Sequence, residues 1–231
     1  MLTRLHARIQ EKIKNRAVAP VIISVLGDSV TEGCTCINMI EPDIVYHAQL
    51  KKMLESRYPH CTFCIINAGV GGENAAQGLL RVERDVIRHD PDLTIVGFCL
   101  NDACAGEFGI NSYRKNLDGI ICLIQEKTKS DIIVLTPNWM PTRDNANIAD
   151  EHKGLTEQFI AIQTGGILSR YAEAAKEVAK ERKAAVADVY AEWQKLSDSG
   201  ADTTAMLANG LNHPDAEGHR IAAETIMKII G

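Results

Sequence analysis

Short apolar runs that alternate with helix-patterned segments constrain the fold of this chain more than any other sequence feature. Five runs have the length and β-branched content of buried strands, at residues 21–26, 63–66, 93–98, 132–136 and 184–189. Apolar residues at helical spacing occur in the intervals and at the C-terminus, at residues 46–57, 75–89, 112–128, 166–183 and 216–230. Strands that alternate with helices form a parallel sheet with helices on both faces. The sequence therefore predicts a three-layer α/β/α sandwich around a five-stranded parallel sheet.

Two segments depart from this alternation. Residues 1–18 interleave basic and aliphatic side chains in an amphipathic pattern, which predicts a helix packed on the domain, although such a segment can also target an organelle or lie on a membrane. Residues 137–154 are polar, contain Pro and Asn, and have no periodicity, which is typical of a functional or mobile loop. We find no repeat, low-complexity tract or linker, so residues 1–231 are predicted to form a single domain.

Polar or glycine-rich clusters follow three of the predicted strands and precede the last helix. They are Gly27-Asp28-Ser29, the run from Asn67 to Gly72, Asn101-Asp102 and Asn212-His213-Pro214. Ligands of such sheets bind beyond the carboxyl ends of the strands, near the point where the strand order reverses. We therefore expect the four clusters to meet at one edge of the sheet and to form its functional site.

Ser29 and His213 are the candidate nucleophile and base. A serine hydroxyl attacks an acyl group only when a base removes its proton, and a histidine can do so near neutral pH. The backbone N–H groups of Ser29 and Gly72 and the side-chain amide of Asn101 are candidate donors to the resulting oxyanion, and glycine at 72 would let that N–H approach closely. Asp28 is expected to brace the turn. Structural roles stay open, with Ser29 as a helix N-cap, Asn101 as a local cap and His213 as a structural histidine.

The four clusters, in this order along nearly the whole chain, resemble those of the SGNH hydrolases, a subgroup of the GDSL lipases and esterases. The name of the subgroup stands for its Ser, Gly, Asn and His, which correspond here to Ser29, Gly72, Asn101 and His213. The resemblance implies a flavodoxin-like sandwich that hydrolyses small-molecule esters through an acyl-enzyme. It implies no cofactor and no metal.

One position departs from the pattern of the family. Many SGNH hydrolases carry an aspartate three residues before the histidine to orient the imidazole, whereas this chain has Gly210 there. A neighbouring asparagine such as Asn209 or a backbone carbonyl could orient the ring instead, without the negative charge that stabilises imidazolium. Asp202 lies in the same segment and could approach the ring. The identity of a third triad member therefore stays open.

Three functions are compatible with these residues. The low aromatic content, 5% of residues, and the absence of an evident apolar lid favour short acyl groups, such as acetyl esters of small polar or carbohydrate-like alcohols. A lipase or thioesterase-like enzyme for longer chains is the second hypothesis, in which Trp139 and Met140 of the long loop would build an acyl pocket. The third is a binding module without turnover, against which the intact Ser29, Asn101 and His213 argue.

Composition argues against other classes of protein. With a formal net charge of -5 and no long basic run, the chain lacks the clustered Lys and Arg of a nucleic-acid-binding protein. No stretch approaches the roughly 18 apolar residues of a membrane-spanning helix, so no stable membrane insertion is expected. The oligomeric state stays open.

Seven cysteines, an odd number, are better explained as mostly buried free thiols in a reducing cytoplasm than as a disulfide framework. The spacings Cys34-x-Cys36 and Cys61-x-x-Cys64 are compatible with zinc. However, strand alternation would place Cys61 and Cys64 on opposite faces, and we expect no metal site. His219 is expected to be a solvated residue of the last helix.

Overall fold

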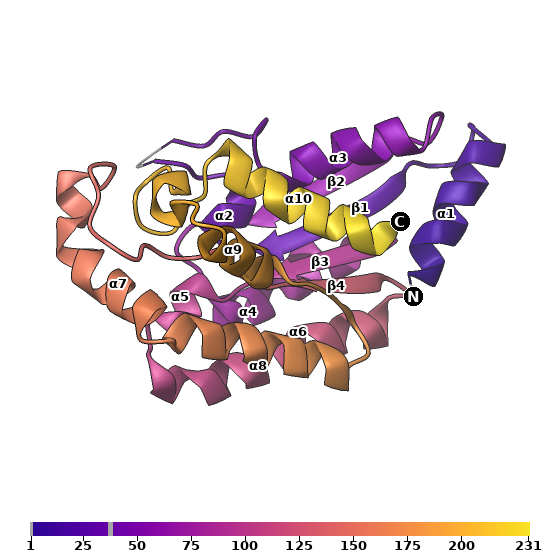
Figure 1. The fold of residues 1–231 in the computed structure, drawn as a ribbon. Helices are drawn as coiled ribbons and strands as arrows, with labels where there is room; N and C mark the ends of the chain where they lie inside the picture. Colours follow the sequence, from indigo (N-terminus) through magenta and orange to yellow (C-terminus); the bar gives the residue numbers. More distant parts are fainter. Residues whose placement is uncertain (1, 37–38) are drawn as a thin grey trace.

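A five-stranded parallel sheet forms the centre of the protein (Figure 1). The computed structural model describes residues 2–36 and 39–231. Its strands lie in the order β2-β1-β3-β4-β5, and every neighbouring pair is parallel. The strands are β1 (Val21–Gly27), β2 (Phe63–Gly69), β3 (Leu93–Gly97), β4 (Asp131–Leu135) and β5 (Ala185–Ala187). This is the flavodoxin-like strand order, and it confirms the predicted sandwich.

Helices cover both faces of the sheet (Figure 1). The α-helices are α1 (Thr3–Lys14), α2 (Ser29–Glu32), α3 (Tyr46–Arg57), α4 (Ala75–Asp85), α5 (Leu100–Ala103), α6 (Ile110–Lys127), α7 (Thr156–Thr164), α8 (Ile167–Glu181), α9 (Val189–Asp198) and α10 (Ala216–Ile230). Helices α3, α9 and α10 lie on one face, and α4, α6 and α8 lie on the other. Within the described ranges, no helix combines the length and the apolar content that crossing a membrane requires.

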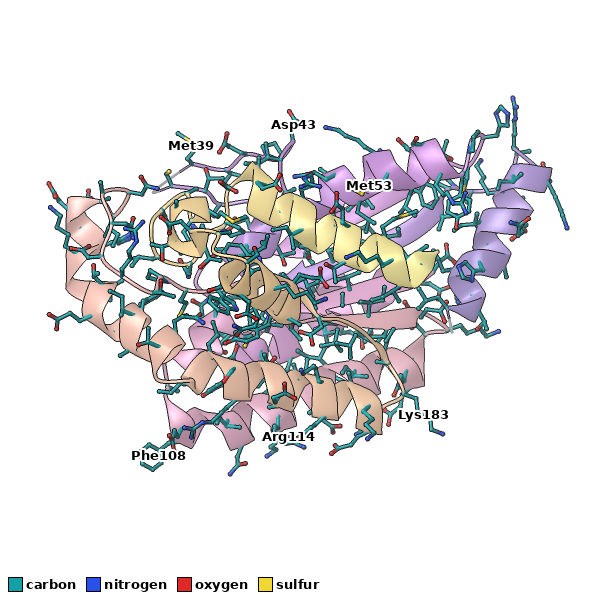
Figure 2. All side chains as sticks on the ribbon, viewed as in Figure 1. Met39, Asp43, Met53, Phe108, Arg114 and Lys183 are labelled. Carbon is teal, nitrogen blue, oxygen red and sulfur yellow. The ribbon has the colours of Figure 1, made fainter. Side chains whose placement is uncertain are left out.

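The three central strands, β1, β3 and β4, are buried on both faces, which explains why their sequences are continuous apolar runs. In β1, Ile23 and Val25 pack in the core on the side of α3 and α10, whereas Leu26 packs on the side of α4 and α6. Figure 2 shows side chains filling the space between the sheet and each helical layer. Phe108, by contrast, projects from the outer edge of the molecule and is fully exposed (Figure 2). The sheet is therefore a rigid support for the loops at its carboxyl edge.

Helix α1 packs near the amino-terminal edge of the sheet, away from the loops that follow the strands (Figure 1). Leu5 and Ile9 of its amphipathic pattern are buried. The side chain of Asp131, at the start of β4, accepts a hydrogen bond from the backbone N–H of Leu5 (2.8 Å). Met1, the first residue of the predicted 1–18 segment, lies outside the described residues.

Besides the one-turn helices α2 and α5, the helices α7 and α9 lie in segments for which the sequence predicts no helix. In α7, four apolar residues run consecutively from Phe159 to Ile162, and the helix packs beside α8 and buries Phe159 and Ile162 of this run. Helix α9 begins where the fifth strand was expected to continue, because Asp188 caps it by accepting a hydrogen bond from the backbone N–H of Ala191 (3.2 Å). Strand β5 is therefore shorter than the predicted 184–189.

The seven cysteines are free, but most of them are not buried. Only Cys61 and Cys99 are buried, while Cys36, Cys64 and Cys104 are exposed. The expectation of mostly buried thiols is therefore wrong; Cys64, for example, lies on β2, an edge strand with an outward-facing side. Within residues 2–36 and 39–231, no group of three or more His, Cys, Asp or Glu side chains is arranged to hold a metal ion.

Candidate active site

The predicted clusters converge at the carboxyl edge of the sheet, between β1 and β3. The chain leaves β1 towards α3 on one face and leaves β3 towards α6 on the other, so a crevice forms between these strand ends (Figure 1). Ser29 begins the short helix α2 directly after β1, and Asn101 lies in α5 after β3. Together with Gly72 and His213, they line a groove of about 430 Å³.

The hydroxyl of Ser29 contacts the imidazole of His213. The distance between Ser29 Oγ and His213 Nε2 is 2.8 Å, and that between His213 Nδ1 and the carbonyl oxygen of Thr35 is 3.2 Å. A carbonyl oxygen only accepts, so Nδ1 carries the proton and Nε2 is the unprotonated nitrogen of the neutral ring. In this tautomer, Nε2 accepts a hydrogen bond from the serine hydroxyl. The pair is therefore arranged to move a proton from Ser29 Oγ to His213 Nε2.

The group that orients His213 is a backbone carbonyl, and neither Asn209 nor Asp202 bonds to the ring. Asn209 Oδ1 instead accepts hydrogen bonds from three successive backbone N–H groups, the last of them that of His213 (2.9 Å). Asp202 is exposed and forms an ion pair with Arg143. The structure does not support the hypothesis that either side chain completes a triad, because one shapes a turn and the other forms a surface pair.

Gly210 occupies the position of the usual aspartate, and the long loop fills the space beside it. Its φ of 73° lies in the left-handed region that favours glycine. A Cβ atom at this position would lie 2.4 Å from Asn145 Oδ1 and 2.6 Å from Ile148 Cγ1. Asn145 also donates its side-chain amide to the carbonyl oxygen of Gly210 (2.9 Å). The loop of residues 137–154 thus occupies the place where an aspartate side chain would begin.

Asp28 braces the turn that carries Ser29. Its carboxylate accepts a hydrogen bond from the backbone N–H of Val30 (3.0 Å) and caps α2. Ser29 is therefore the first residue of the helix, and the alternative that it serves as the N-cap is wrong. Burial raises the pKa of Asp28 to about 7, and the nearby carboxylate of Asp102 acts in the same direction.

Gly72 and Asn101, the candidate oxyanion donors, line the same groove as Ser29. Gly72 has a φ of 76°, and a Cβ atom there would meet nothing within 4 Å. The positive φ therefore favours glycine at this position, and the close approach to an oxyanion stays a prediction. Asn101 Nδ2 donates to the carbonyl oxygen of Glu73 (2.7 Å), which orients the amide and leaves its second N–H available.

Burial lowers the pKa of His213 below its ordinary value of 6.5. The hydrogen bond to the carbonyl of Thr35 acts in the opposite direction, whereas the positive charge of a protonated His152 lowers the pKa further. His152 belongs to the long loop and lines the same groove. The imidazole of His213 is therefore neutral, and able to accept a proton, around neutral pH.

The long loop lines the groove with residues other than those predicted. Trp139 and Met140 are buried in the core, where Trp139 packs against Tyr190 with ring centroids 5.7 Å apart. Neither lines the groove, so the prediction that they build an acyl pocket is wrong. His152 lines it instead, as does Phe159 of α7. The only sequence signal for His152 is its place in the loop that has no periodicity.

His219 is fully buried, so the prediction of a solvated histidine is wrong. It lies one helical turn before Ala222 and Ala223 on the buried face of α10. Its Nδ1 accepts a hydrogen bond from the backbone N–H of Tyr46 (3.3 Å), and its Nε2 has no partner among the described residues. Burial lowers the pKa of His219 to about 3, so the ring is neutral.

Sequence comparison relates most of the chain to one family. The profile of the GDSL-like lipase/acylhydrolase family matches residues 25–221. No curated protein sequence gives a significant match. The matched range includes all four candidate site residues.

Solved structures share the fold at low sequence identity. An acetylxylan esterase from Geobacillus stearothermophilus superposes with a TM-score of 0.70 and 20% identity, over 91% of this chain and 94% of that chain. A lipase/acylhydrolase from Enterococcus faecalis does so with a TM-score of 0.70 and 21% identity, over 91% of this chain and 95% of that chain. Catalytic mutants of the Geobacillus enzyme replace a serine, a histidine, or the aspartate three residues before that histidine by alanine.

Proposed function

The chain belongs to the GDSL-like lipase/acylhydrolase family and is a carboxylic ester hydrolase, and we propose that it cleaves its substrates through an acyl-enzyme formed on Ser29. The single observation that carries this proposal is the distance of 2.8 Å between Ser29 Oγ and His213 Nε2, in a groove that substrate can enter. The tautomer of His213 supports it, because Nδ1 donates to the carbonyl of Thr35 and leaves Nε2 free to accept a proton.

In the first half of the proposed reaction, the hydroxyl of Ser29 attacks the ester carbonyl while His213 Nε2 takes its proton. The backbone N–H groups of Ser29 and Gly72 and the amide of Asn101 donate hydrogen bonds to the oxyanion of the tetrahedral intermediate. The bond between the carbonyl carbon and the alcohol oxygen then breaks, and His213 returns the proton to the departing oxygen. In the second half, a water molecule activated by His213 attacks the acyl-enzyme, releases the acid and regenerates Ser29.

Ser29 and His213 act as a dyad in this proposal, with the carbonyl of Thr35 in the place of a carboxylate. A carbonyl dipole holds the ring in one tautomer and one orientation, but it lacks the full negative charge that stabilises imidazolium. The lowered pKa of His213 agrees with this arrangement.

The lining of the groove supports short acyl esters of polar alcohols as substrates. The side chain of His152 can form hydrogen bonds with hydroxyl groups, while Leu155, Phe159 and Leu211 form an apolar wall. This mixture suits a small acyl group and a hydroxylated alcohol better than a long alkyl chain, which needs a continuous apolar channel. The acetylxylan esterase with the same fold makes carbohydrate esters a rational first choice for tests.

Ser29→Ala should abolish the hydrolysis of p-nitrophenyl acetate and leave the unfolding temperature close to that of the parent, because the lost hydroxyl carries little packing. A fluorophosphonate should label the parent chain on Ser29 and should not label the variant. Ser199→Ala, which changes an exposed serine after α9, is the matched control and should keep full activity. Substantial kcat in a folded Ser29→Ala protein would show that the nucleophile lies elsewhere.

A panel of p-nitrophenyl esters of rising chain length, together with acetylated sugars, tests the substrate class. We expect the highest kcat/KM for acetyl esters, with a decline as the acyl chain grows. A maximum at long acyl chains would instead indicate a lipase or a thioesterase-like enzyme. Labelling of Ser29 without turnover of any ester would refute the proposed substrates and leave the nucleophile in place.

A further inference from the structure

Arg81 of α4 lies buried behind the loops that carry the candidate oxyanion donors. Its side chain is 8% exposed and does not line the groove. The guanidinium donates to the carbonyl oxygen of Gly27 (2.9 Å) and to that of Ala68 (2.7 Å). Gly27 is the last residue of β1, and Ala68 precedes the last residue of β2. One side chain therefore joins the ends of the two strands from which the loops of Ser29 and Gly72 leave.

The same guanidinium reaches the third donor through Glu73. Arg81 Nε donates to Glu73 Oε2 (2.5 Å), and Glu73 directly follows Gly72. The carbonyl oxygen of Glu73 accepts the side-chain amide of Asn101 (2.7 Å). Asp85 accepts a further hydrogen bond from Arg81 Nη1 (3.1 Å), which adds to the constraint on the guanidinium plane. The contacts of Arg81 thus extend to all three segments that supply the donors.

We propose that Arg81 is a positioning residue that sets the relative placement of the three oxyanion donors, an inference that rests on the proposed roles of Ser29, Gly72 and Asn101. A guanidinium suits this task because its planar fork donates in several fixed directions at once. Oxyanion stabilisation depends on donors that are in place before the charge develops. A displacement of about 1 Å in such a site can cost about 10²-fold in rate.

The pairing of β1 with β2 indicates that Arg81 is not needed to hold these two strands together. Strands β1 and β2 are paired along their whole length, and the backbone N–H of Val70 donates to the carbonyl oxygen of Gly27 (3.1 Å). The sheet therefore keeps its register without the guanidinium. Arg81 instead determines the direction of the segment that contains Gly72 and Glu73, because its guanidinium binds the carboxylate of Glu73.

Arg81→Lys and Arg81→Gln test the proposal. Three different nitrogens of Arg81 donate to the oxygens of Gly27, Ala68 and Glu73. An ammonium or an amide has its donors on a single nitrogen and cannot reproduce this spread, so kcat should fall by about tenfold or more while KM changes little. The affinity for a boronic acid, which forms a tetrahedral adduct with Ser29, should fall in proportion to kcat/KM. If Arg81 had a purely structural role, its variants would unfold at a lower temperature, but their boronic acid affinity would not fall in proportion to kcat/KM.

Arg84→Gln is the matched control, because Arg84 lies on the same helix, pairs with Asp85 and is exposed. It should keep the kcat and KM of the parent. If the Arg81 variants do not fold, Glu73→Ala removes the same link from the other side, and it should lower kcat and the boronic acid affinity together. Parental kcat and parental boronic acid affinity in a folded Arg81→Gln or Glu73→Ala protein would overturn the proposal.

Labelling distinguishes a failure of this proposal from a failure of the proposed function. If a fluorophosphonate does not label Ser29 in the parent chain, both the nucleophile and the positioning role of Arg81 are refuted. If Ser29 is labelled and the folded Arg81 variants have parental kinetics, the nucleophile stands and the positioning role alone is refuted.

Discussion

A histidine that is oriented by a carbonyl differs from one oriented by a carboxylate in the charge beside its ring. The carbonyl of Thr35 keeps Nδ1 of His213 protonated, as a carboxylate would, but it offers the imidazolium no ionic partner. Burial also lowers the pKa of His213, because it disfavours the charged ring. His213 therefore stays neutral, and able to act as a base, at a lower pH than an exposed histidine does.

The acidic limb of kcat/KM should lie below pH 6.5. The base must be neutral to take the proton of Ser29, so activity falls as the pH drops through the pKa of His213, and a lowered pKa moves this fall to lower pH. His152→Asn removes the coulombic effect of His152, which lowers the pKa of His213, and it should therefore shift the limb to higher pH. The pH–rate profiles of both proteins measure this, with folding checked at each pH. A parental limb above pH 6.5 would indicate that a carboxylate stabilises the imidazolium.

Asn101→Ala should lower kcat by about 10²- to 10³-fold, with a smaller change in KM, as expected when one oxyanion donor is lost. The carbonyl of Glu73 orients this amide before substrate binds, so the lost donor is a preorganised one. Steady-state kinetics with p-nitrophenyl acetate measure the effect. Asn111→Ala, which removes an exposed amide of α6, serves as the control. A rise in KM at unchanged kcat would mean that Asn101 binds the substrate and does not stabilise the oxyanion.

At the level of secondary-structure elements, hydrogen bonds join the loop of residues 137–154 to the turn before α10. Asn145 donates to the carbonyl oxygen of Gly210 (2.9 Å), and Asn147 donates to that of Leu207 (3.2 Å). These contacts place loop atoms where the side chain of an aspartate at position 210 would lie. The departure from the family pattern is thus a property of two packed segments and not of one residue alone.

Gly210→Asp should lower both stability and kcat/KM, and it should not restore a triad. The new residue would need a φ of 73°, and its Cβ would lie within 3 Å of atoms of Asn145 and Ile148. The left-handed conformation costs about 1–2 kcal/mol, and the steric overlap adds to this cost. Each kcal/mol lowers the unfolding temperature of a chain of this size by about 2–4 °C. Thermal unfolding and steady-state kinetics measure the two losses.

Gly200→Asp is the matched control for this substitution. Gly200 also has a positive φ, 89°, but a Cβ atom there would meet nothing within 4 Å. Gly200→Asp should therefore lower the stability only by the cost of the left-handed backbone conformation, without steric overlap, and it should leave kcat/KM unchanged. An increase in kcat/KM for Gly210→Asp, with the acidic limb moved to higher pH, would show that the loop yields and that a triad forms.

At the scale of the whole molecule, buried ionisable groups link folding to pH. Burial lowers the pKa of His219 to about 3, so below pH 6.5 the unfolded chain binds a proton that the folded chain excludes. This group therefore destabilises the fold as the pH falls from 6.5 towards 3, by at most about 1.4 kcal/mol per pH unit. Burial raises the pKa of Asp28 to about 7 and that of Asp102 to about 6. These two groups act in the opposite direction, because the folded chain holds their protons more tightly.

His219→Asn should reduce the loss of stability between pH 6.5 and 4. The asparagine oxygen can still accept from the backbone N–H of Tyr46, while the ionisable ring is gone. Urea unfolding of parent and variant at several pH values measures the difference, in which the contributions of Asp28 and Asp102 cancel. His89→Asn, at an exposed position, is the control. Parallel stability curves for His219→Asn and the parent would contradict a low pKa for His219.

Much of the fold and the location of the site could be predicted from local patterns. The apolar run at residues 21–26 and the apolar stripe at 216–230 are properties of neighbouring residues, and both became the elements expected of them. Alternating strands and helices require a parallel sheet, and a parallel sheet brings the ends of its strands to one edge. For this reason the sequence predicts that Ser29, Gly72 and Asn101 lie close together.

Local patterns in the sequence are enough to specify the architecture and the edge at which the motifs meet, whereas the surroundings of each side chain depend on tertiary contacts. Thr35 lies 178 positions from His213 and contacts it through a backbone carbonyl, a group that every residue carries. His219 is buried because α3 packs over it, and Arg81 joins two strand ends from a third element. Periodicity and turn residues act between neighbours in the chain. The orientation of an imidazole and the burial of a charge depend instead on contacts between residues that are far apart in sequence.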